Sequence, residues 1–383
     1  MARATERAGA AGRADSPVSM VAPISEQEFM RFDPRLAREK RPLQVGQPET
    51  FPVRTDDGVE LRLTRYRGGA KGPVILSHCI GVSSLMYSID TIEPNLLEYL
   101  FHAGYDVWLL DHRFSINLPV SREQFSFDDI AMRDYPAVVS AVCQATGVGS
   151  VQIVAHGVGS STLTMALLSG LESVRAAVLS QVSTHLYTTW SNRLKAQTRM
   201  PALLSSIGVR EMTAYTDAMA GSAERLYDGA LRMYPVEAEE RCSNPVCRRI
   251  TVMYGQLYEH DRLNDKTHDA LPEMFGVVNL RAFAQLSRIV RAGHLVDEGG
   301  AERYLPHLDR LKLPIAFIHG SENVCVLPRS TEHTANLLSQ VNGADYYRHH
   351  LIDGYGHVDC IFGHNAARDV YGHVLEHLDS NSA

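Results

Sequence analysis

The sequence predicts an α/β fold in which a mostly parallel central sheet is flanked by helices and carries a helical cap insertion. From residue 50 onward, short apolar runs alternate with stretches of helical pattern, which is typical of parallel strands joined by helices. The runs Pro73–His78 and Asp106–Asp111 are largely apolar, as strands buried on both faces are. A third run, Val151–Ala155, leads through a glycine-rich turn into a helix, so we expect it at the centre of the sheet.

Further elements are expected on both sides of these three strands. The turn Asp56-Asp57-Gly58 predicts an antiparallel hairpin between strands Phe51–Arg54 and Val59–Tyr66. Later strands are expected over 174–182, 314–320 and 346–352, and helices over 92–102, 126–146, 330–341 and 366–378, with another beginning near Ser160.

The strand pattern stops for more than a hundred residues in the second half of the chain. We therefore expect a helical cap over 186–310, inserted into a core formed by 46–185 and 311–383. Residues 1–45 are expected to be a disordered or loosely packed tail. The first twenty residues lack the uninterrupted apolar stretch of a secretory signal.

Composition excludes several classes of function. The formal charge of −7 and the scattered Lys and Arg residues give no basic face for nucleic acid. No apolar run approaches the roughly 20 residues of a membrane span, so we expect a cytoplasmic protein. Of six cysteines only Cys242 and Cys247 are close in sequence, and they either form a disulfide or merely pack.

The segment Val154-Ala-His-Gly-Val-Gly159 has the pattern of a nucleophile elbow. Such a strand-to-helix turn needs small residues on both sides of the nucleophile, and Ala155 and Gly159 supply them. The position between them is Gly157, which has no side chain to attack with. Ser160 is the nearest hydroxyl, but we expect it in the first helical turn as a cap or core contact.

The loop Asp353–Asp359 follows the last predicted strand and contains His357, the predicted catalytic histidine. Its orienting partner is either Asn323 or Glu322, which follow the strand ending at Gly320. An amide at Asn323 holds an imidazole tautomer but supplies no charge, whereas Glu322 supplies charge if it turns inward. The alternative is that Glu322 faces solvent and Asn323 only shapes the turn.

An oxyanion hole is expected from backbone N–H groups of Val158 and of the Cys79-Ile80 stretch. Cys79 then lies in the same cavity as His357, and one hypothesis is that His357 lowers the pKa of its thiol and makes it reactive. The alternative is that Cys79 packs as a small apolar residue.

Several polar residues are candidate substrate contacts. Four lie in the cap with partly helical spacing, and the alternative is that they form a polar helix surface. The candidates are His156, Tyr258, His260, Asn264 and His268. Because His260, His268 and the doublet His349-His350 lack a recognisable ligand spacing, we predict neither a metal nor a cofactor.

The chain resembles the acid lipase branch of the α/β-hydrolases. The resemblance lies in Leu76–Gly81, Gly104–Arg113, the elbow, and Tyr355–Gly363. From about residue 50 onward it is still more similar to bacterial hydrolases found fused to, or beside, cholesterol-oxidase-like flavin oxidoreductases, including Arg241–Ile250, 256–260 and 263–268.

This resemblance implies His357 as the histidine, Asn323 at the position of the aspartate, and a flavin oxidoreductase as a functional partner. The chain departs from it at Gly157, where relatives carry cysteine or serine, and at Cys79, where glycine is usual.

Four functional hypotheses follow. The first is an enzyme acting on a small lipophilic ester, lactone or related carbonyl compound, in which His357 works by general acid–base chemistry. In that hypothesis the space beside Gly157 holds water or part of the substrate, and no covalent serine intermediate forms. The others are a hydrolase or transferase with Cys79 as nucleophile, a non-hydrolytic lyase or cyclase, and a non-catalytic protein that binds a lipophilic ligand.

Overall fold

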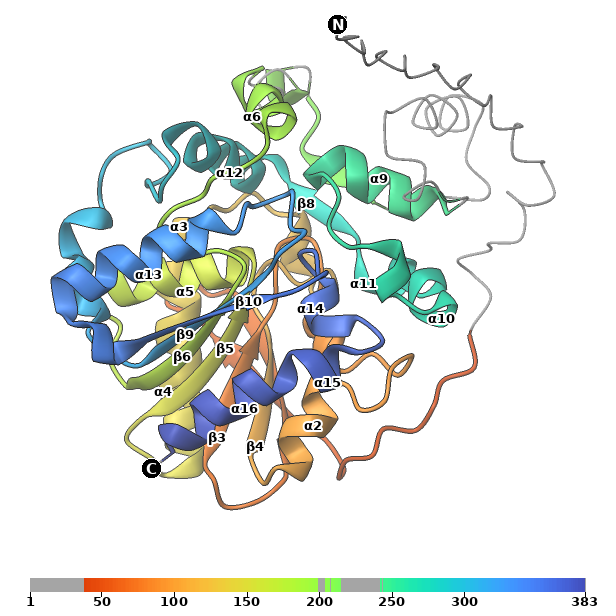
Figure 1. Ribbon diagram of the computed structural model, residues 1–383, viewed down its shortest axis with the longest axis vertical. Helices are drawn as coiled ribbons and strands as arrows, with labels where there is room; N and C mark the ends of the chain where they lie inside the picture. The colour runs from red at the N-terminus through yellow and green to blue at the C-terminus, as the bar shows by residue number, and fades with distance from the viewer. Residues whose placement is uncertain (1–37, 199–203, 207, 215–241, 243, 383) are drawn as a thin grey trace, which may run out of the picture.

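The computed structural model describes residues 38–198, 204–206, 208–214, 242 and 244–382, and these form one large sheet covered by helices (Figure 1). The eight strands follow the order β1-β2-β4-β3-β5-β6-β9-β10. All neighbours are parallel except β2 with its two partners. The strands are β1 (Glu49–Arg54), β2 (Glu60–Arg67), β3 (Pro73–Ser77), β4 (Asp106–Asp111), β5 (Val151–His156), β6 (Val174–Ser180), β9 (Ile315–Gly320) and β10 (Tyr347–Ile352). The predicted mostly parallel sheet is confirmed.

Burial of the strands follows their place in the sheet. β3, β4, β5 and β9 are buried at every residue, whereas β1 at the edge alternates between more and less exposed positions. Helices on both faces explain the continuous apolar runs of the central strands. The predicted hairpin is also confirmed, with Thr55 N–H donating to Val59 O at 2.9 Å across its turn.

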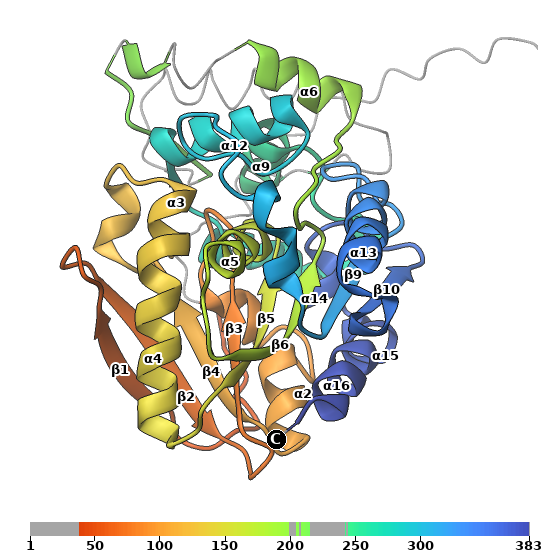
Figure 2. The ribbon, with the colours of Figure 1, turned by 90° about the vertical axis from the view of Figure 1, so that its left-hand side faces the viewer.

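Helices cover both faces of the sheet (Figures 1 and 2). α2 and α16 contact each other on one face, and α4 and α5 contact each other on the other. The core helices are α2 (Leu96–His102), α3 (Phe127–Asp129), α4 (Tyr135–Thr146), α5 (Val158–Leu168), α13 (Arg329–Asn342), α14 (Asp359–Phe362), α15 (Ala366–Asp369) and α16 (Tyr371–Ser380).

Local capping explains where some helices differ from expectation. The helix predicted from Ile92 begins at Leu96, because the Asn95 side chain accepts a hydrogen bond from Glu98 N–H and the Glu98 carboxylate accepts one from Asn95 N–H. Ser126 caps the next helix, at the predicted place. A π-helical turn at Ile130–Asp134 then interrupts it before α4.

The described residues between β6 and β9 lie over the carboxyl ends of the central strands (Figure 2). In the part of this region that the structure describes, no strand joins the large sheet. Its elements are α6 (Trp190–Gln197), β7 (Glu211–Thr213), α9 (Pro245–Tyr254), a 3-10 helix at His260–Arg262, α10 (Asp265–Asp269), α11 (Leu271–Met274), β8 (Val277–Asn279) and α12 (Leu280–Ala292). This covering layer closes the loops after β3 and β5 from above.

The described chain begins next to the core. Arg38 forms an ion pair with Asp90 at 2.6 Å, and Arg41 forms one with the fully buried Glu98 carboxylate at 2.6 Å. Most of the expected N-terminal tail, residues 1–37, lies outside the described residues. Among the helices that the structure describes, none has the length and apolar character needed to cross a membrane.

Candidate active site

The turn between β5 and α5 carries a glycine at its tip. Gly157 has φ 55° and ψ −124°, a left-handed conformation that side chains rarely adopt. A Cβ atom at Gly159 would lie 2.4 Å from the His78 carbonyl oxygen, so glycine is required there. The Ser160 hydroxyl donates to Ala155 O at 2.6 Å and is a core contact, as predicted. The turn thus keeps the shape of a nucleophile elbow without a nucleophile.

The side chain of Cys79 fills the space beside Gly157. A Cβ atom on Gly157 would lie 2.5 Å from Cys79 Sγ and 2.9 Å from His357 Nε2. The sulfur accepts a hydrogen bond from Val158 N–H at 3.3 Å. The expectation of room for water beside this glycine is therefore wrong, because the sulfur atom takes that room.

The protonation of Cys79 also differs from expectation. Burial raises the pKa of its thiol to about 11, although hydrogen bonds from the backbone N–H groups of Val158 and Ile80 act in the opposite direction. The expected lowering by His357 is wrong, because that imidazole is itself held neutral. Both predicted oxyanion donors, Val158 and Ile80, face the sulfur in this state.

Asn323 contacts His357 through its amide nitrogen. Asn323 Nδ2 lies 3.0 Å from His357 Nδ1. The orientation of the amide follows from its other partners. Its Oδ1 accepts the backbone N–H groups of Cys325 at 3.0 Å and Val326 at 2.9 Å, and its Nδ2 donates to Gln181 Oε1 at 2.9 Å. Turning the amide over would set its NH2 group against two N–H donors.

This network selects one tautomer of His357. The orientation of Gln181 is fixed by Gly320 N–H, which donates to its Oε1 at 3.2 Å. The amide nitrogen of Asn323 is therefore the donor, and His357 Nδ1 accepts. A neutral imidazole that accepts at Nδ1 carries its proton on Nε2. His357 consequently directs Nε2–H toward the space beside Gly157.

Burial keeps the imidazoles of this region uncharged. Desolvation lowers the pKa of His357 well below 6.5, and neighbouring His156 and His319 lower it further. Burial also lowers the pKa of His156 to about 3. His156 packs its ring against His357 with 4.9 Å between ring centroids, and its Nδ1 lies 3.0 Å from Ser180 Oγ. The site therefore holds two neutral imidazoles in contact.

A small cavity of about 60 Å³ adjoins Cys79 and His357 and reaches the covering helices. That volume corresponds to roughly two water molecules at their liquid volume. Its lining is mostly apolar and consists of Cys79, Ile80, Val82, Val158, Ser161, Val182, Leu186, Tyr254, Leu257, Phe275, Leu286, Cys325, Val326, His357 and Val358. Such a lining suits an apolar ligand.

Comparison with known proteins agrees with this fold. Residues 72–204 match the family described as alpha/beta hydrolase fold. Human lipase member K is 24% identical over 85% of this chain and 86% of its own length. Human lysosomal acid lipase/cholesteryl ester hydrolase is 31% identical over 30% of this chain and 33% of its own. The solved monoacylglycerol lipase of Paleococcus ferrophilus has a TM-score of 0.53 and 15% identity, covering 85% of this chain and 100% of that one.

The chain has the α/β-hydrolase fold. The resemblance to acid lipases that the sequence indicated is confirmed at this level. In this fold, the loop after β10 brings His357 to the elbow after β5, and the loop after β9 brings Asn323 to His357.

Glu322 does not take part in this arrangement. It is exposed and accepts a hydrogen bond from the Ser321 hydroxyl at 2.8 Å. The prediction that it might turn toward His357 is wrong, since Asn323 points inward and its neighbour in the chain consequently points to solvent.

The four cap residues named as substrate contacts do not share one helix. Tyr258 precedes the 3-10 helix that begins at His260, and Asn264 caps α10, which contains His268. The prediction that they share a helical face is therefore wrong. The Asn264 side chain accepts a hydrogen bond from Thr267 N–H, so a new helix begins there. None of the four lines the cavity beside His357, which Leu257 reaches instead.

The structure forms no disulfide between Cys242 and Cys247. Both thiols instead meet His260 and His268, with the ligand atoms of all four residues within 4.8 Å of one another. The prediction of no metal rested on ligand spacing in the sequence, and the spacing of these four residues matches none of the common ligand motifs.

Sequence reasoning missed two residues of the active site. Tyr254 lines the cavity, and its buried hydroxyl has no hydrogen-bond partner among the described residues. Gly81 leaves room for it, since a Cβ atom there would lie 2.4 Å from the Tyr254 oxygen. Gln181 orients Asn323. Neither carries a local sequence signal, because both act through contacts between distant segments.

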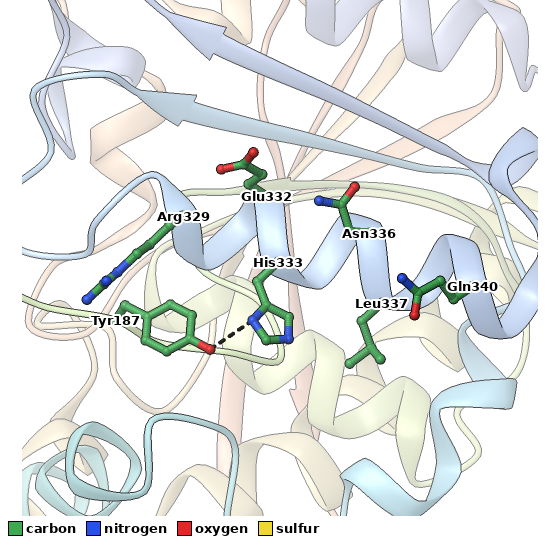
Figure 3. Close-up of a pocket in the computed structure, with 7 residues that line it drawn as sticks. All are labelled: Tyr187, Arg329, Glu332, His333, Asn336, Leu337 and Gln340. Carbon is green, nitrogen blue, oxygen red and sulfur yellow. Dashed lines mark hydrogen bonds between the residues drawn. The ribbon is translucent and has the colours of Figure 1, made fainter.

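A second, wider hollow of about 590 Å³ lies along α13 (Figure 3). Tyr187 reaches over this helix, and its hydroxyl lies 2.8 Å from His333 Nδ1. The lining residues are Tyr187, Arg329, Glu332, His333, Asn336, Leu337 and Gln340. Since no predicted site residue lines it, the cavity beside His357 remains the candidate active site.

Proposed function

We propose that the protein is an enzyme that acts on the carbonyl group of a small lipophilic ester or lactone, with His357 as a hydrogen-bond donor. The single observation that carries this proposal is the Asn323 amide nitrogen facing His357 Nδ1 at 3.0 Å. In a serine-hydrolase triad the partner accepts from the histidine, which frees the other nitrogen to act as a base. Here the direction of the hydrogen bond is reversed, because Asn323 Nδ2 donates and His357 Nδ1 accepts.

A neutral imidazole with its proton on Nε2 polarises a carbonyl oxygen without needing to be charged. Tyr254 is a second donor for the same oxygen, because burial raises the pKa of its hydroxyl well above 10 and keeps it protonated. The attacking group is then water or a hydroxyl of the substrate, and its proton finishes on the leaving oxygen. The missing side chain at Gly157 is consistent with a reaction that forms no acyl-enzyme at the elbow.

The substrate class rests on the apolar lining and on relatives that are named as lipases. A cavity of about 60 Å³ is too small for an ester with an acyl chain. Lining side chains, Cys79 among them, therefore move when the substrate enters.

The test compares His357→Gln with His357→Ala on short- and long-chain p-nitrophenyl esters and aliphatic lactones. Glutamine keeps an N–H donor but is no base, so we expect kcat/KM of the Gln variant to exceed that of the Ala variant at least tenfold. ¹⁵N NMR of the imidazole should show the proton on Nε2. The exposed His102→Gln serves as the matched control. Equal, complete loss in both His357 variants would indicate a base and overturn the proposal.

A second candidate is favoured by the position of the Cys79 sulfur, which fills the space of the missing nucleophile. In that candidate Cys79 attacks the carbonyl carbon and an acyl-thioester forms. Cys79→Ala separates the two. This substitution abolishes turnover if Cys79 is the nucleophile. It leaves turnover unchanged or raises it if the sulfur only fills the space beside Gly157. Cys325→Ala is the control, because that thiol lines the same cavity.

A further inference from the structure

Two thiols and two imidazoles meet in the covering layer, apart from the active site. Cys247 lies in the first turn of α9, His260 begins a 3-10 helix, and His268 lies in α10. Cys242 precedes α9 and completes the group. One ligand atom from each residue lies within 4.8 Å of the other three.

The spacing of these atoms agrees with tetrahedral coordination. Zinc binds sulfur at about 2.3 Å and imidazole nitrogen at about 2.0 Å, which places a sulfur and a nitrogen ligand about 3.5 Å apart. Cys247 Sγ and His260 Nε2 are separated by 3.5 Å. A separation of this size is also that of a weak thiol hydrogen bond, so the complete four-residue set is what distinguishes a metal site.

The surroundings hold the four residues in place. The Asn244 side chain accepts from Cys247 N–H at 3.4 Å and donates to His268 O at 3.0 Å, so it joins the segments of two ligands. The rings of His260 and His268 lie 5.1 Å apart, and Tyr258 packs on His260 with 5.3 Å between ring centroids. His268 Nε2 is buried and has no hydrogen-bond partner among the described residues. A buried polar nitrogen needs a partner, and a bound ion would supply one.

We propose that Cys242, Cys247, His260 and His268 bind one Zn²⁺ ion as a structural site. Two thiolates with two imidazoles favour zinc over magnesium or calcium, which prefer oxygen ligands. Four protein ligands leave no open position, as in structural rather than catalytic zinc sites. The ligands come from three separate segments of the chain. The ion would therefore hold these parts of the covering layer together.

The site is connected to the active site through the chain between its ligands. Leu257 lies between Cys247 and His260, and its carbonyl oxygen accepts the backbone N–H groups of His357 at 2.9 Å and Val358 at 2.8 Å. Zinc at the cluster therefore fixes the segment that positions the catalytic histidine loop. This is a positioning role, and the ion does not touch the substrate.

The test measures metal in the untagged full-length chain. Inductively coupled plasma mass spectrometry should find about one zinc per chain after dialysis. Replacing zinc by Co²⁺ should give the intense visible bands of a tetrahedral site together with thiolate-to-cobalt charge transfer. Both readouts are independent of enzymatic activity, so they distinguish failure of this proposal from failure of the proposed function.

Two variants localise the ion. Cys247→Ser should remove the charge-transfer band, whereas Cys143→Ser, which changes a thiol in α4, should retain zinc and the cobalt spectrum. Absence of zinc from the wild-type chain, together with no cobalt–thiolate absorption on titration, overturns the proposal. Equal cobalt spectra in the two variants overturn it as well. If Cys247→Ser does not fold, the wild-type cobalt spectrum decides.

Discussion

The active site and the cluster in the covering layer use the same residue types in opposite ways. Beside Gly157, a single thiol meets the neutral His357, and burial raises the pKa of Cys79 to about 11. In the cluster, the hydrogen bonds with Cys247 and His260 lower the pKa of Cys242. The comparison teaches that burial and hydrogen-bond partners, rather than the mere presence of Cys and His, set the direction in which the pKa of a thiol shifts.

Lowering the pH is the most direct test of whether the buried histidines of the active site are uncharged. Burial lowers the pKa of His156 to about 3, that of His319 to about 4, and that of His357 well below 6.5. In the unfolded chain each titrates near 6.5, so the unfolded state binds more protons below that pH. The free energy of unfolding should therefore fall as pH drops below about 6.5, by up to roughly 1.4 kcal/mol per pH unit for each histidine. Urea denaturation between pH 7 and 5 measures it, and His156→Gln should flatten the slope.

Adding a side chain at Gly157 tests whether the Cys79 sulfur occupies the position of the nucleophile. Gly157→Ser should destabilise the protein, because its Cβ would lie 2.5 Å from Cys79 Sγ and 2.9 Å from His357 Nε2. Overpacking of this kind costs about 1–3 kcal/mol, and the left-handed backbone adds about 1–3 kcal/mol. Thermal denaturation should show the loss, and the double variant C79G/G157S should recover part of it. An undisturbed single variant would contradict the filled space.

Chelation should act on the cluster and leave the active-site thiol unaffected. A site with free zinc at 100 times its Kd contributes about 2.7 kcal/mol of stability, which EDTA removes. We expect a lower unfolding midpoint in EDTA for wild type and Cys143→Ser, but no further change for Cys247→Ser. Differential scanning fluorimetry measures this shift. An unfolding midpoint that EDTA does not change in any of the three proteins would contradict a zinc site in the cluster.

The smallest change tests the orientation of one hydrogen bond. In Asn323→Asp, both carboxylate oxygens accept, so His357 must place its proton on Nδ1 and lose it from Nε2. If His357 is a donor, kcat should fall about tenfold or more; if it is a base, kcat should rise. The same variant sets an oxygen against Gln181 Oε1, at a cost of about 1–3 kcal/mol. Steady-state kinetics with a parallel pH profile separate the two readings.

The sequence predicted those elements whose structure depends mainly on residues close to one another in the chain. The sheet strands, the hairpin at Gly58 and the elbow follow from apolar runs and turn residues. The sequence did not predict the direction of the Asn323 amide, because that depends on Gln181 and on two backbone N–H groups. It did not predict the cysteine and histidine cluster either, since its ligands come from separate segments.

Glu322 and Cys79 show the same limit at single residues. Adjacent side chains in a loop diverge, and only the packing around Asn323 decides which of the two turns inward. The raised pKa of Cys79 follows from complete burial, which a sequence motif does not report.

The contact between Cys79 and Gly157 makes substitutions at the two positions depend on each other. With the sulfur 2.5 Å from where a Cβ atom would stand, a side chain at 157 clashes with Cys79 in this backbone. Cys79 can be exchanged for a smaller residue while Gly157 stays, whereas a side chain at 157 needs the sulfur to be removed or displaced. The accessible order of substitutions is therefore asymmetric: position 79 changes first, or both positions change together.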